Sequence, residues 1–454
     1  MAREFNFSAN REQSKTSLDS AEVQPKIEGR AFKDSGIEWI GQIPKEWKVC
    51  LTSMLFHEHK EKNSGLKETN LLSLSYGAIK RKDINTNEGL LPQSFETYNV
   101  IKKGDIIFRL TDLQNDKRSL RTGLCKENGI ITSAYVTLRA NKELNSAYFH
   151  YLFHSYDICK VFYGLGDGVR QGMNWEDVRK VMIFLPSLSE QQKIANFLDK
   201  VCGEVDEMVA LQETMIEELK AYKQSVITEA VTKGLNPNAP MRNSGIDWIG
   251  EIPDEWNLIS LQSLSESIRN GYVGPTRDLF KDEGVKYIQS LHLKDGTIDF
   301  DKHHYFVSED WANKHPKIFK DDLLIVQTGD IGQVAVVTPE YDACNCHALI
   351  IVVLKSELCL PLYVSYYLRS SVGKELLLQC KTGALLPHLN SGKIGVTPIT
   401  LPSLDEQRAI ATYLDTKCSE IDSLIALKQA KIEELKEYKK SVIYEYVTGK
   451  KEVI

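Results

Sequence analysis

The 454-residue chain has no apolar run that approaches the roughly 18 residues of a membrane-spanning helix. Its first residues lack the basic, apolar and small-residue segments of a secretory signal peptide. Nine cysteines, an odd number scattered along the chain, suit free thiols better than a disulfide framework. These absences predict a cytoplasmic protein, and the composition, 42% apolar and 26% charged, is that of an ordinary globular chain. Its length suggests about three domains.

Excess positive charge is also missing, because the formal net charge is −6 at pH 7. The charge is unevenly spread along the chain. Residues 35–186 carry 21 Lys and Arg against 17 Asp and Glu, a balance of +4, whereas residues 244–402 carry 14 against 20, a balance of −6. If the chain holds DNA, we expect it to do so through local clusters and with help from a partner's basic surface.

Motifs for catalysis and nucleotide binding are absent as well. The sequence has no P-loop and no Gly-x-Gly-x-x-Gly after a strand, and the spaced glycines of 164–168 indicate a loop. Cys344, Cys346 and His347 resemble half a zinc site, but no second pair stands at zinc-finger spacing, so a strand running into 348–353 is the preferred interpretation. No Ser/His/Asp or paired-carboxylate arrangement occurs in both halves. We therefore predict no catalytic residue and no metal site in this chain.

What the sequence does contain is a long internal repeat. SGIEWIG at 35–41 returns as SGIDWIG at 244–250, and both copies continue through Ile-Pro to a second tryptophan. LPSL at 185–188, followed by Glu-Gln, returns at 401–404. These copies are offset by 209 and 216 positions, which is far longer than the repeats of about 50 residues that build solenoids. The repeat therefore indicates two whole domains that perform one task at two places.

A long helix is predicted after each Leu-Pro-Ser-Leu segment. Pro186 ends the preceding strand, and Ser187 with Glu190 matches a capping box, in which the Ser side chain bonds a free helix amide and the Glu reaches back to another. Ser403 and Glu406 repeat this pattern. The first helix should end near residue 233, which gives it a length of roughly 65–70 Å at 1.5 Å per residue.

Both helices carry an apolar seam with alternating spacings of three and four residues, which is typical of a coiled coil. Polar residues interrupt it at Gln212, Lys417, Lys428 and Lys431. The seam is wide, so we expect the helices to pair with each other and with a foreign helix; a hairpin that only completes this protein's own core is the alternative. The residues expected to pack against partner helices are Leu198, Val205, Met208, Met215, Leu219, Tyr222, Leu414, Ile421, Leu424, Leu435 and Tyr438.

The regions between the repeated segments contain side chains that can contact DNA. Arg and Lys reach guanine O6 and N7, Asn and Gln reach adenine N6 and N7, and Lys neutralises phosphate. For any single residue the alternative is a solvated surface side chain. The candidates in the first domain are Lys80, Arg81, Lys82, Arg109, Lys117, Arg118, Arg121, Arg170, Gln171 and Asn174. The candidates in the second domain are Arg269, Asn270, Tyr272, Arg277, Gln289, His292, Lys294, Gln327, Thr328, His388 and Asn390.

The order of these segments resembles that of the specificity (S) subunit of type I restriction–modification enzymes, over about residues 33–450. The resemblance implies two target-recognition domains, each of which reads one half of a split DNA sequence. It also implies two methyltransferase (M) subunits that bind S-adenosylmethionine and methylate adenine, and two restriction (R) subunits that use ATP and Mg. The S chain itself would bind no cofactor. Loops at 168–171 and 388–390 stand where such domains have a loop before their last strand, and their different sequences fit an asymmetric target.

The expected fold is thus α+β: two pseudo-symmetric α/β target-recognition domains separated by two long antiparallel coiled-coil spacer helices. The expected segments are a flexible arm at 1–32, a first domain at 33–186, a first helix at 187–233, a linker at 234–243, a second domain at 244–402 and a second helix at 403–450. Two other functions compete with DNA recognition. A protein-binding adaptor would explain the acidic charge, and an enzyme is the least favoured because the motifs are missing.

Overall fold

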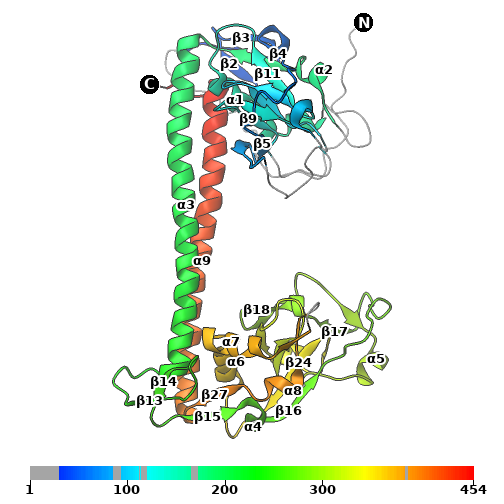
Figure 1. The fold of residues 1–454 in the computed structure, drawn as a ribbon, viewed down its shortest axis with the longest axis vertical. Coiled ribbons are helices and arrows are strands. Elements are labelled where there is room, and N and C mark those ends of the chain that lie inside the picture. Colours follow the sequence, from blue (N-terminus) through cyan, green and yellow to red (C-terminus); the bar gives the residue numbers. More distant parts are fainter. Residues whose placement is uncertain are drawn as a thin grey trace. The chain divides into compact units, whose positions relative to one another are not determined.

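The computed structural model describes residues 30–84, 94–111, 113, 120–164, 172–383 and 387–453. The chain divides into two units. The first comprises Met1–Ala210 and Ile432–Ile454, and the second comprises Leu211–Lys431. Figure 1 shows the ribbon. Because each unit contains parts of both long helices, the domain boundaries fall within helices rather than at their ends.

A four-stranded antiparallel sheet forms the centre of the first unit. Its order is β4 (Phe56–Glu58), β11 (Val136–Ala140), β8 (Ile106–Phe108) and β9 (Thr122–Leu124). Helix α1 (Ser146–Ile158) packs on this sheet through rings: Phe149 lies 5.2 Å from Phe56, and Phe153 lies 5.0 Å from Phe108, centroid to centroid. All four rings are buried, so they form the apolar core of the unit.

The remaining elements of the first unit form short antiparallel pairs around that core. The paired strands are β1 (Phe32–Asp34) with β2 (Gln42–Pro44), β3 (Lys48–Leu51) with β12 (Met182–Leu185), β5 (Leu72–Ser75) with β6 (Ala78–Arg81), and β7 (Asn99–Ile101) with β10 (Gly129–Ile131). A one-turn helix, α2 (Trp175–Val178), precedes β12.

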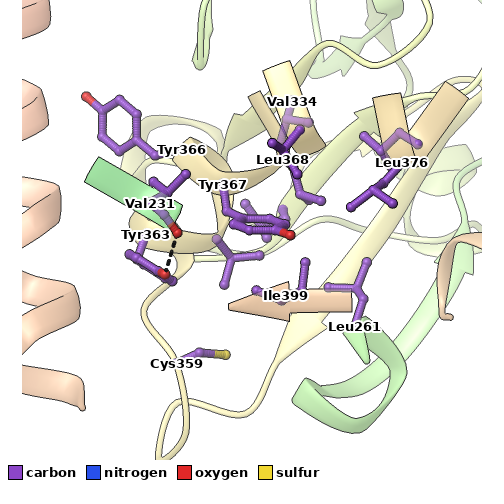
Figure 2. Close-up of a cluster of buried hydrophobic side chains, with 14 of the residues drawn as sticks. Val231, Leu261, Val334, Cys359, Tyr363, Tyr366, Tyr367, Leu368, Leu376 and Ile399 are labelled. Carbon is purple, nitrogen blue, oxygen red and sulfur yellow. Dashed lines mark hydrogen bonds between the residues drawn. The ribbon is translucent and has the colours of Figure 1, made fainter. Parts of the chain in front are cut away.

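The second unit repeats this topology. Its antiparallel sheet has the order β16 (Ser265–Asn270), β24 (Leu349–Leu354), β21 (Leu323–Val326) and β22 (Val334–Val336), which is the same chain order as in the first unit. Helices α6 (Pro361–Arg369) and α7 (Ser371–Gln379) cover it. Figure 2 shows Tyr367, Leu368 and Leu376 in the core that results, with Ile399 beside them.

The other elements of the second unit again form small pairs and single turns. The strands are β13 (Met241–Asn243) with β14 (Glu251–Pro253), β15 (Asn257–Ser260) with β27 (Pro398–Leu401), β17 (Val285–Ile288) with β20 (Phe306–Val307) and β23 (Asn345–Cys346), β18 (Leu293–Lys294) with β19 (Thr297–Ile298), and β25 (Lys381–Thr382) with β26 (His388–Leu389). The short helices are α4 (Leu261–Leu264), α5 (Glu309–Asn313) and α8 (Ser391–Ile394). The predicted α+β fold with two pseudo-symmetric domains is confirmed.

The two long helices are α3 (Leu188–Lys233) and α9 (Leu404–Val447), close to the predicted limits. They lie side by side and antiparallel in each unit (Figure 1), as one ion pair in each unit shows. Lys439 Nζ lies 2.7 Å from Asp206 in the first unit, and Lys223 Nζ lies 2.7 Å from Asp422 in the second. The two ion pairs are equivalent by the sequence repeat: a shift of 216 positions relates Asp206 to Asp422 and Lys223 to Lys439.

The seam between the helices is partly apolar and partly polar. Leu198, Val205, Leu414, Ile421 and Leu435 are buried, and Leu198 and Leu414 belong to the apolar cores of their own units. The polar interruptions Gln212 and Lys428 meet each other, because Lys428 Nζ donates to Gln212 Oε1 at 3.3 Å. Met215 and Leu219 are half-buried, whereas the other four predicted packing residues, Met208, Tyr222, Leu424 and Tyr438, are 44–58% exposed.

The predicted capping boxes are only half correct. Ser187 Oγ accepts a hydrogen bond from the Glu190 amide at 3.2 Å, as predicted. The Glu190 carboxylate, however, accepts from Trp47 Nε1 at 2.9 Å, and its counterpart Glu406 accepts from Trp256 Nε1 at 3.0 Å. The buried indoles outcompete the helix terminus, which explains why a second tryptophan belongs to the repeat.

The Gln that follows each of these glutamates is buried and bonds backbone groups. Gln191 accepts from the Asn145 amide and donates to the Pro186 carbonyl, both at 3.0 Å. Gln407 accepts from the Leu360 amide at 2.9 Å and donates to Leu358 and Pro402. These amides join the start of each long helix to the sheet-covering helix of the same unit.

Several smaller expectations also have outcomes. All nine cysteines are free thiols, and Cys346 lies in a buried strand as preferred. No helix in the described part of the chain has both the length and the apolar character needed to cross a membrane. The arm predicted at 1–32 lies mainly outside the described residues, but its end is folded: Arg30 forms ion pairs with Glu46 and Glu190, and β1 begins at Phe32.

Candidate nucleic-acid interface

The loop before the last strand is built in the same way in both units. Asn174 accepts a hydrogen bond from the Glu176 amide and so caps α2, and Asn390 accepts from the Gly392 amide and caps α8. The residue before each Asn forms a backbone bond to the end of a central strand: Met173 to Leu110, and Leu389 to Gln327, both at 2.9 Å. Both Asn side chains are exposed but already bonded to backbone, so these two predicted base readers also shape the loops that carry them.

Four of the first-domain candidates, Lys117, Arg118, Arg170 and Gln171, lie outside the described residues. Lys80, Arg81 and Lys82 are exposed on or just after β6, so they remain candidates for contacts with DNA. The Arg81 guanidinium is paired with Glu127. Arg109 is half-buried, and its backbone amide donates to the Arg121 carbonyl at 2.8 Å.

Arg121 was predicted to contact DNA, and this prediction is wrong because its side chain is fully buried. Its guanidinium donates to the Thr111 carbonyl at 2.9 Å, and its backbone amide donates to the Asp157 carboxylate. Burial raises the pKa of the Asp157 carboxyl to about 6, against the opposing effect of that amide. Arg121 therefore holds the end of a loop against α1 instead of reaching solvent.

Arg269 in the second unit is also structural in large part. It is half-buried, donates to the Lys317 carbonyl at 3.0 Å and lies 3.9 Å from the buried Asp322. The first unit also pairs an Arg with a buried Asp, but from another strand. Arg139 of β11 forms two hydrogen bonds to Asp105, which lies just before β8. An Arg that neutralises a buried carboxylate is only partly available to DNA.

His292 is the second prediction that the structure overturns. Its side chain is fully buried, accepts from the Gln289 amide at Nδ1 and bonds the His303 carbonyl from Nε2, both at 2.9 Å. Burial lowers the pKa of this imidazole, so it stays neutral with its proton on Nε2. His292 fixes a turn, and Gln289 keeps only its half-buried side chain for other contacts.

The remaining candidates of the second unit lie near the surface. The exposed ones are Asn270, Arg277, Lys294 and Thr328, and the half-buried ones are Tyr272, Gln327 and His388. Gln327 Nε2 donates to the Leu389 carbonyl, which ties the β21–β22 turn to the loop before β27. The Tyr272 ring packs edge-on against Trp311 and His315, with centroids 5.0 and 5.1 Å away. This surface is richer in aromatic and amide groups than in charge.

The long helices carry a repeated set of exposed apolar side chains, which we call the helix patches. Met208, Leu211 and Tyr222 on α3 are 44–58% exposed. A shift of 216 positions gives Leu424, Leu427 and Tyr438 on α9, which are 47–67% exposed. Neither Leu211 nor Leu427 is among the packing residues predicted from the sequence, although the repeat offset of 216 relates the two. Exposed large apolar groups at matched positions are typical of an interaction surface.

The described residues contain no group of three or more His, Cys, Asp or Glu that could hold a metal ion. Taken together, the site comprises two surfaces of similar framework and different side chains, with helix patches at matched positions. This arrangement defines a protein of two repeated units that differ in their surface residues.

Comparison with known proteins agrees with that class. A family model for the type I restriction modification DNA specificity domain matches residues 45–221 and 253–437. The chain belongs to this family of specificity subunits, which are DNA-binding components of type I restriction–modification systems.

Relatives and a solved structure extend the match over most of the chain. The chain is 25% identical over 426 residues to a putative type I restriction enzyme MjaX specificity subunit of Methanocaldococcus jannaschii, covering 90% of this chain and 95% of that one. It is 26% identical over 341 residues to the MjaVIII specificity subunit of the same organism, covering 71% and 75%. A structure from work on assembly and conformational transition of the type I R-M system has the same fold, with a TM-score of 0.68 at 18% identity over 90% of this chain and 99% of that one.

Proposed function

We propose that the chain is a non-catalytic subunit that reads the two halves of a bipartite DNA target, one half with each unit. The observation that carries this proposal is one sheet topology used twice with different loop residues around it. Lys80 and Lys82 are exposed on one surface, and Asn270 and Arg277 on the other. Different side chains on equal frames would read two different half-sites, which gives an asymmetric target.

The long helices would set the distance between the half-sites. A continuous helix of 46 residues such as α3 is roughly 70 Å long at 1.5 Å per residue. A helix pair is stiff where a Gly/Ser linker is flexible, so the length of the DNA between half-sites would follow from helix length. An ion pair joins the two helices in each unit, and both helices carry buried apolar side chains, which supports a rigid spacer.

The helix patches would dock two methyltransferase subunits, one on each patch, and two restriction subunits would join through them. S-adenosylmethionine, ATP and Mg would bind on those partners and not on this chain. The matched positions of the patches support two equal sites. A hairpin that only completes its own core would have no reason to expose Leu211 and Leu427 at 58% and 67%.

A domain exchange tests the reading function. Replacing residues 35–185 by the corresponding segment of another specificity subunit should change one half of the methylated sequence and leave the other half and the spacing intact. Sequencing of methylated DNA from cells that express each version reads this directly. A change in both halves would contradict the division between units.

A second experiment tests the spacer. Inserting one helical turn into α3 after Thr214 and one into α9 after the equivalent Ala430, which the ion pairs place about opposite each other, should lengthen the tolerated DNA spacer without altering either half-site. An unchanged spacer length would show that the helices do not set the distance between the half-sites.

A protein-binding adaptor is the competing function, favoured by the acidic second unit. Binding of the purified chain to its target, with and without the methyltransferase partner, over a salt series separates the two. A DNA reader weakens steeply as salt rises because counterions are released on binding, whereas an adaptor shows no binding to the duplex at all.

A further inference from the structure

The turn between β5 and β6 holds an aromatic residue in a strained and exposed position. Tyr76 has φ +47° and Gly77 has φ +80°, the two left-handed residues that a two-residue hairpin turn requires. Asn, Asp and Gly adopt this conformation readily, whereas a bulky residue does so at a cost. The Tyr76 side chain is 75% exposed, so burial does not offset that cost.

The equivalent hairpin of the second unit shows what the turn alone would select. Between β18 and β19 the turn residues are Asp295 and Gly296, with φ +50° and +93°. Aspartate is a usual residue at this position. The two hairpins share their geometry, and only the first unit replaces Asp by Tyr. Strain that the fold does not need points to a function for the side chain.

The body of the hairpin is held firmly beneath the turn. Leu74 and Ile79 pack so closely over Gly123 that a Cβ there would lie 2.6 and 3.0 Å from them. A Cβ on Gly77 would lie 3.0 Å from Leu120 Cδ1. The hairpin therefore presents Tyr76 on a rigid support, which lowers the entropy lost on binding.

The neighbours of Tyr76 favour DNA as the partner. Lys80 on β6 and Lys82 just after it are exposed and follow Tyr76 in the chain, and they are cations rather than the apolar residues that would surround an aromatic anchor in a protein interface. A two-stranded β-ribbon fits the major groove, and an aromatic ring packs against the flat face of any base.

We propose that Tyr76 is a DNA-contacting residue of the first unit, with its ring packed against bases while Lys80 and Lys82 neutralise neighbouring phosphates. This rests on the proposed function and deepens it, because it assigns a contact that the second unit does not make. The hairpin would then contribute to affinity through the ring and to register through the two lysines.

The test compares Tyr76→Asn with Tyr76→Phe in the complex with the methyltransferase subunit, on the target identified by methylation sequencing. Asn tolerates the turn, so the melting temperature of Tyr76→Asn should not fall. Its affinity for target DNA should fall about five- to 150-fold, the equivalent of one lost base–aromatic contact. Tyr76→Phe keeps the ring and should retain affinity within about threefold. Asp295→Asn, at the equivalent turn, is the matched control and should bind as the wild type does.

A second readout locates the contact. With 2-aminopurine placed in turn at each adenine of the first half-site and adjoining spacer, the wild-type complex should change the fluorescence at one position, and Tyr76→Asn should abolish that change. Equal affinity and fluorescence for wild type and Tyr76→Asn would overturn the assignment and leave the proposed function intact. So would weaker methyltransferase binding with unchanged DNA affinity of the assembled complex, since Tyr76 would then contact protein. If the wild-type complex binds no specific sequence, both proposals fail.

Discussion

The buried glutamines at the start of the long helices allow a prediction whose size follows from the hydrogen bonds. Gln407 is fully buried and bonds three backbone groups, of Leu358, Leu360 and Pro402, whereas Gln191 bonds two. Replacement by Leu keeps the approximate volume and removes all of these bonds. At about 1 kcal/mol for each bond and about 1–3 kcal/mol for an amide left buried without a partner, Gln407→Leu should cost about 4–6 kcal/mol of local stability. Gln191→Leu should cost about 1 kcal/mol less, because it loses one bond fewer.

Hydrogen exchange measured by mass spectrometry reads these losses separately in each unit, because it reports the free energy of local opening. Gln407→Leu should speed exchange in peptides covering 358–364 and 404–410, and leave the peptides of the first unit unchanged. The exposed Gln429 of α9 provides the control, since its replacement by Leu should cost less than about 0.5 kcal/mol. Equal exchange in Gln407→Leu and Gln429→Leu would show that this amide does not join α9 to α6.

Three further predictions concern two buried residues, Arg121 and Asp157, and the helix patches. Arg121→Ala should destabilise the first unit by about 2–4 kcal/mol in chemical denaturation, because it strips a buried guanidinium from its partners, while Lys80→Ala should leave stability unchanged and weaken DNA binding. Burial raises the pKa of Asp157 to about 6, so the folded state takes up this proton at a higher pH than the unfolded state does. This carboxyl should therefore add up to about 3 kcal/mol to the stability of the first unit as pH falls from about 7 to 4. Chemical denaturation of the wild type and of Asp157→Asn at both pH values should show that the variant lacks this contribution. Leu211→Arg and Leu427→Arg should each remove one methyltransferase subunit from the complex weighed by native mass spectrometry, and the double variant should bind none; two subunits on the double variant would exclude the helix patches as docking sites.

The frame of the molecule could be predicted because the repeat marks it directly. Markers copied at offsets of 209 and 216 located both helices within three residues, since helix limits depend on local signals: for α3, Pro186 before the helix and Gly234, with φ +77°, after it. The role of Glu190 was predicted wrongly because a capping box is a local motif, whereas the indole that takes the carboxylate lies 143 positions away. Local patterns predict where a helix starts, but not which distant group bonds its first turn.

The candidate contact residues were harder to predict, and two residues show why. Arg121 and His292 have the side chains of DNA readers, yet each is buried by contacts made through the fold. Residue type alone cannot separate a guanidinium that reads guanine from one that satisfies Thr111. Tyr76 was missed for the opposite reason, because an aromatic residue before Gly suggests a core strand, and only its backbone conformation and exposure show otherwise.

The contacts that attach each unit to the long helices occur in both units. Tyr151 donates to Asp199 of α3, and its counterpart Tyr366 donates to Asp415 of α9, which anchors α1 and α6 to the long helices in the same way. The tryptophan–glutamate and glutamine contacts at the helix starts are equally matched.

Other contacts differ between the copies. The Arg that neutralises the buried carboxylate comes from the last sheet strand in one unit and from the first in the other, and the hairpin turn carries Tyr76 in one and Asp295 in the other. A domain that is fixed to the helices by a few matched bonds can change its other residues without altering those bonds. If the units read DNA as we propose, separate residues for attachment and recognition would allow one half-site to be replaced while the spacing and the other half-site are kept.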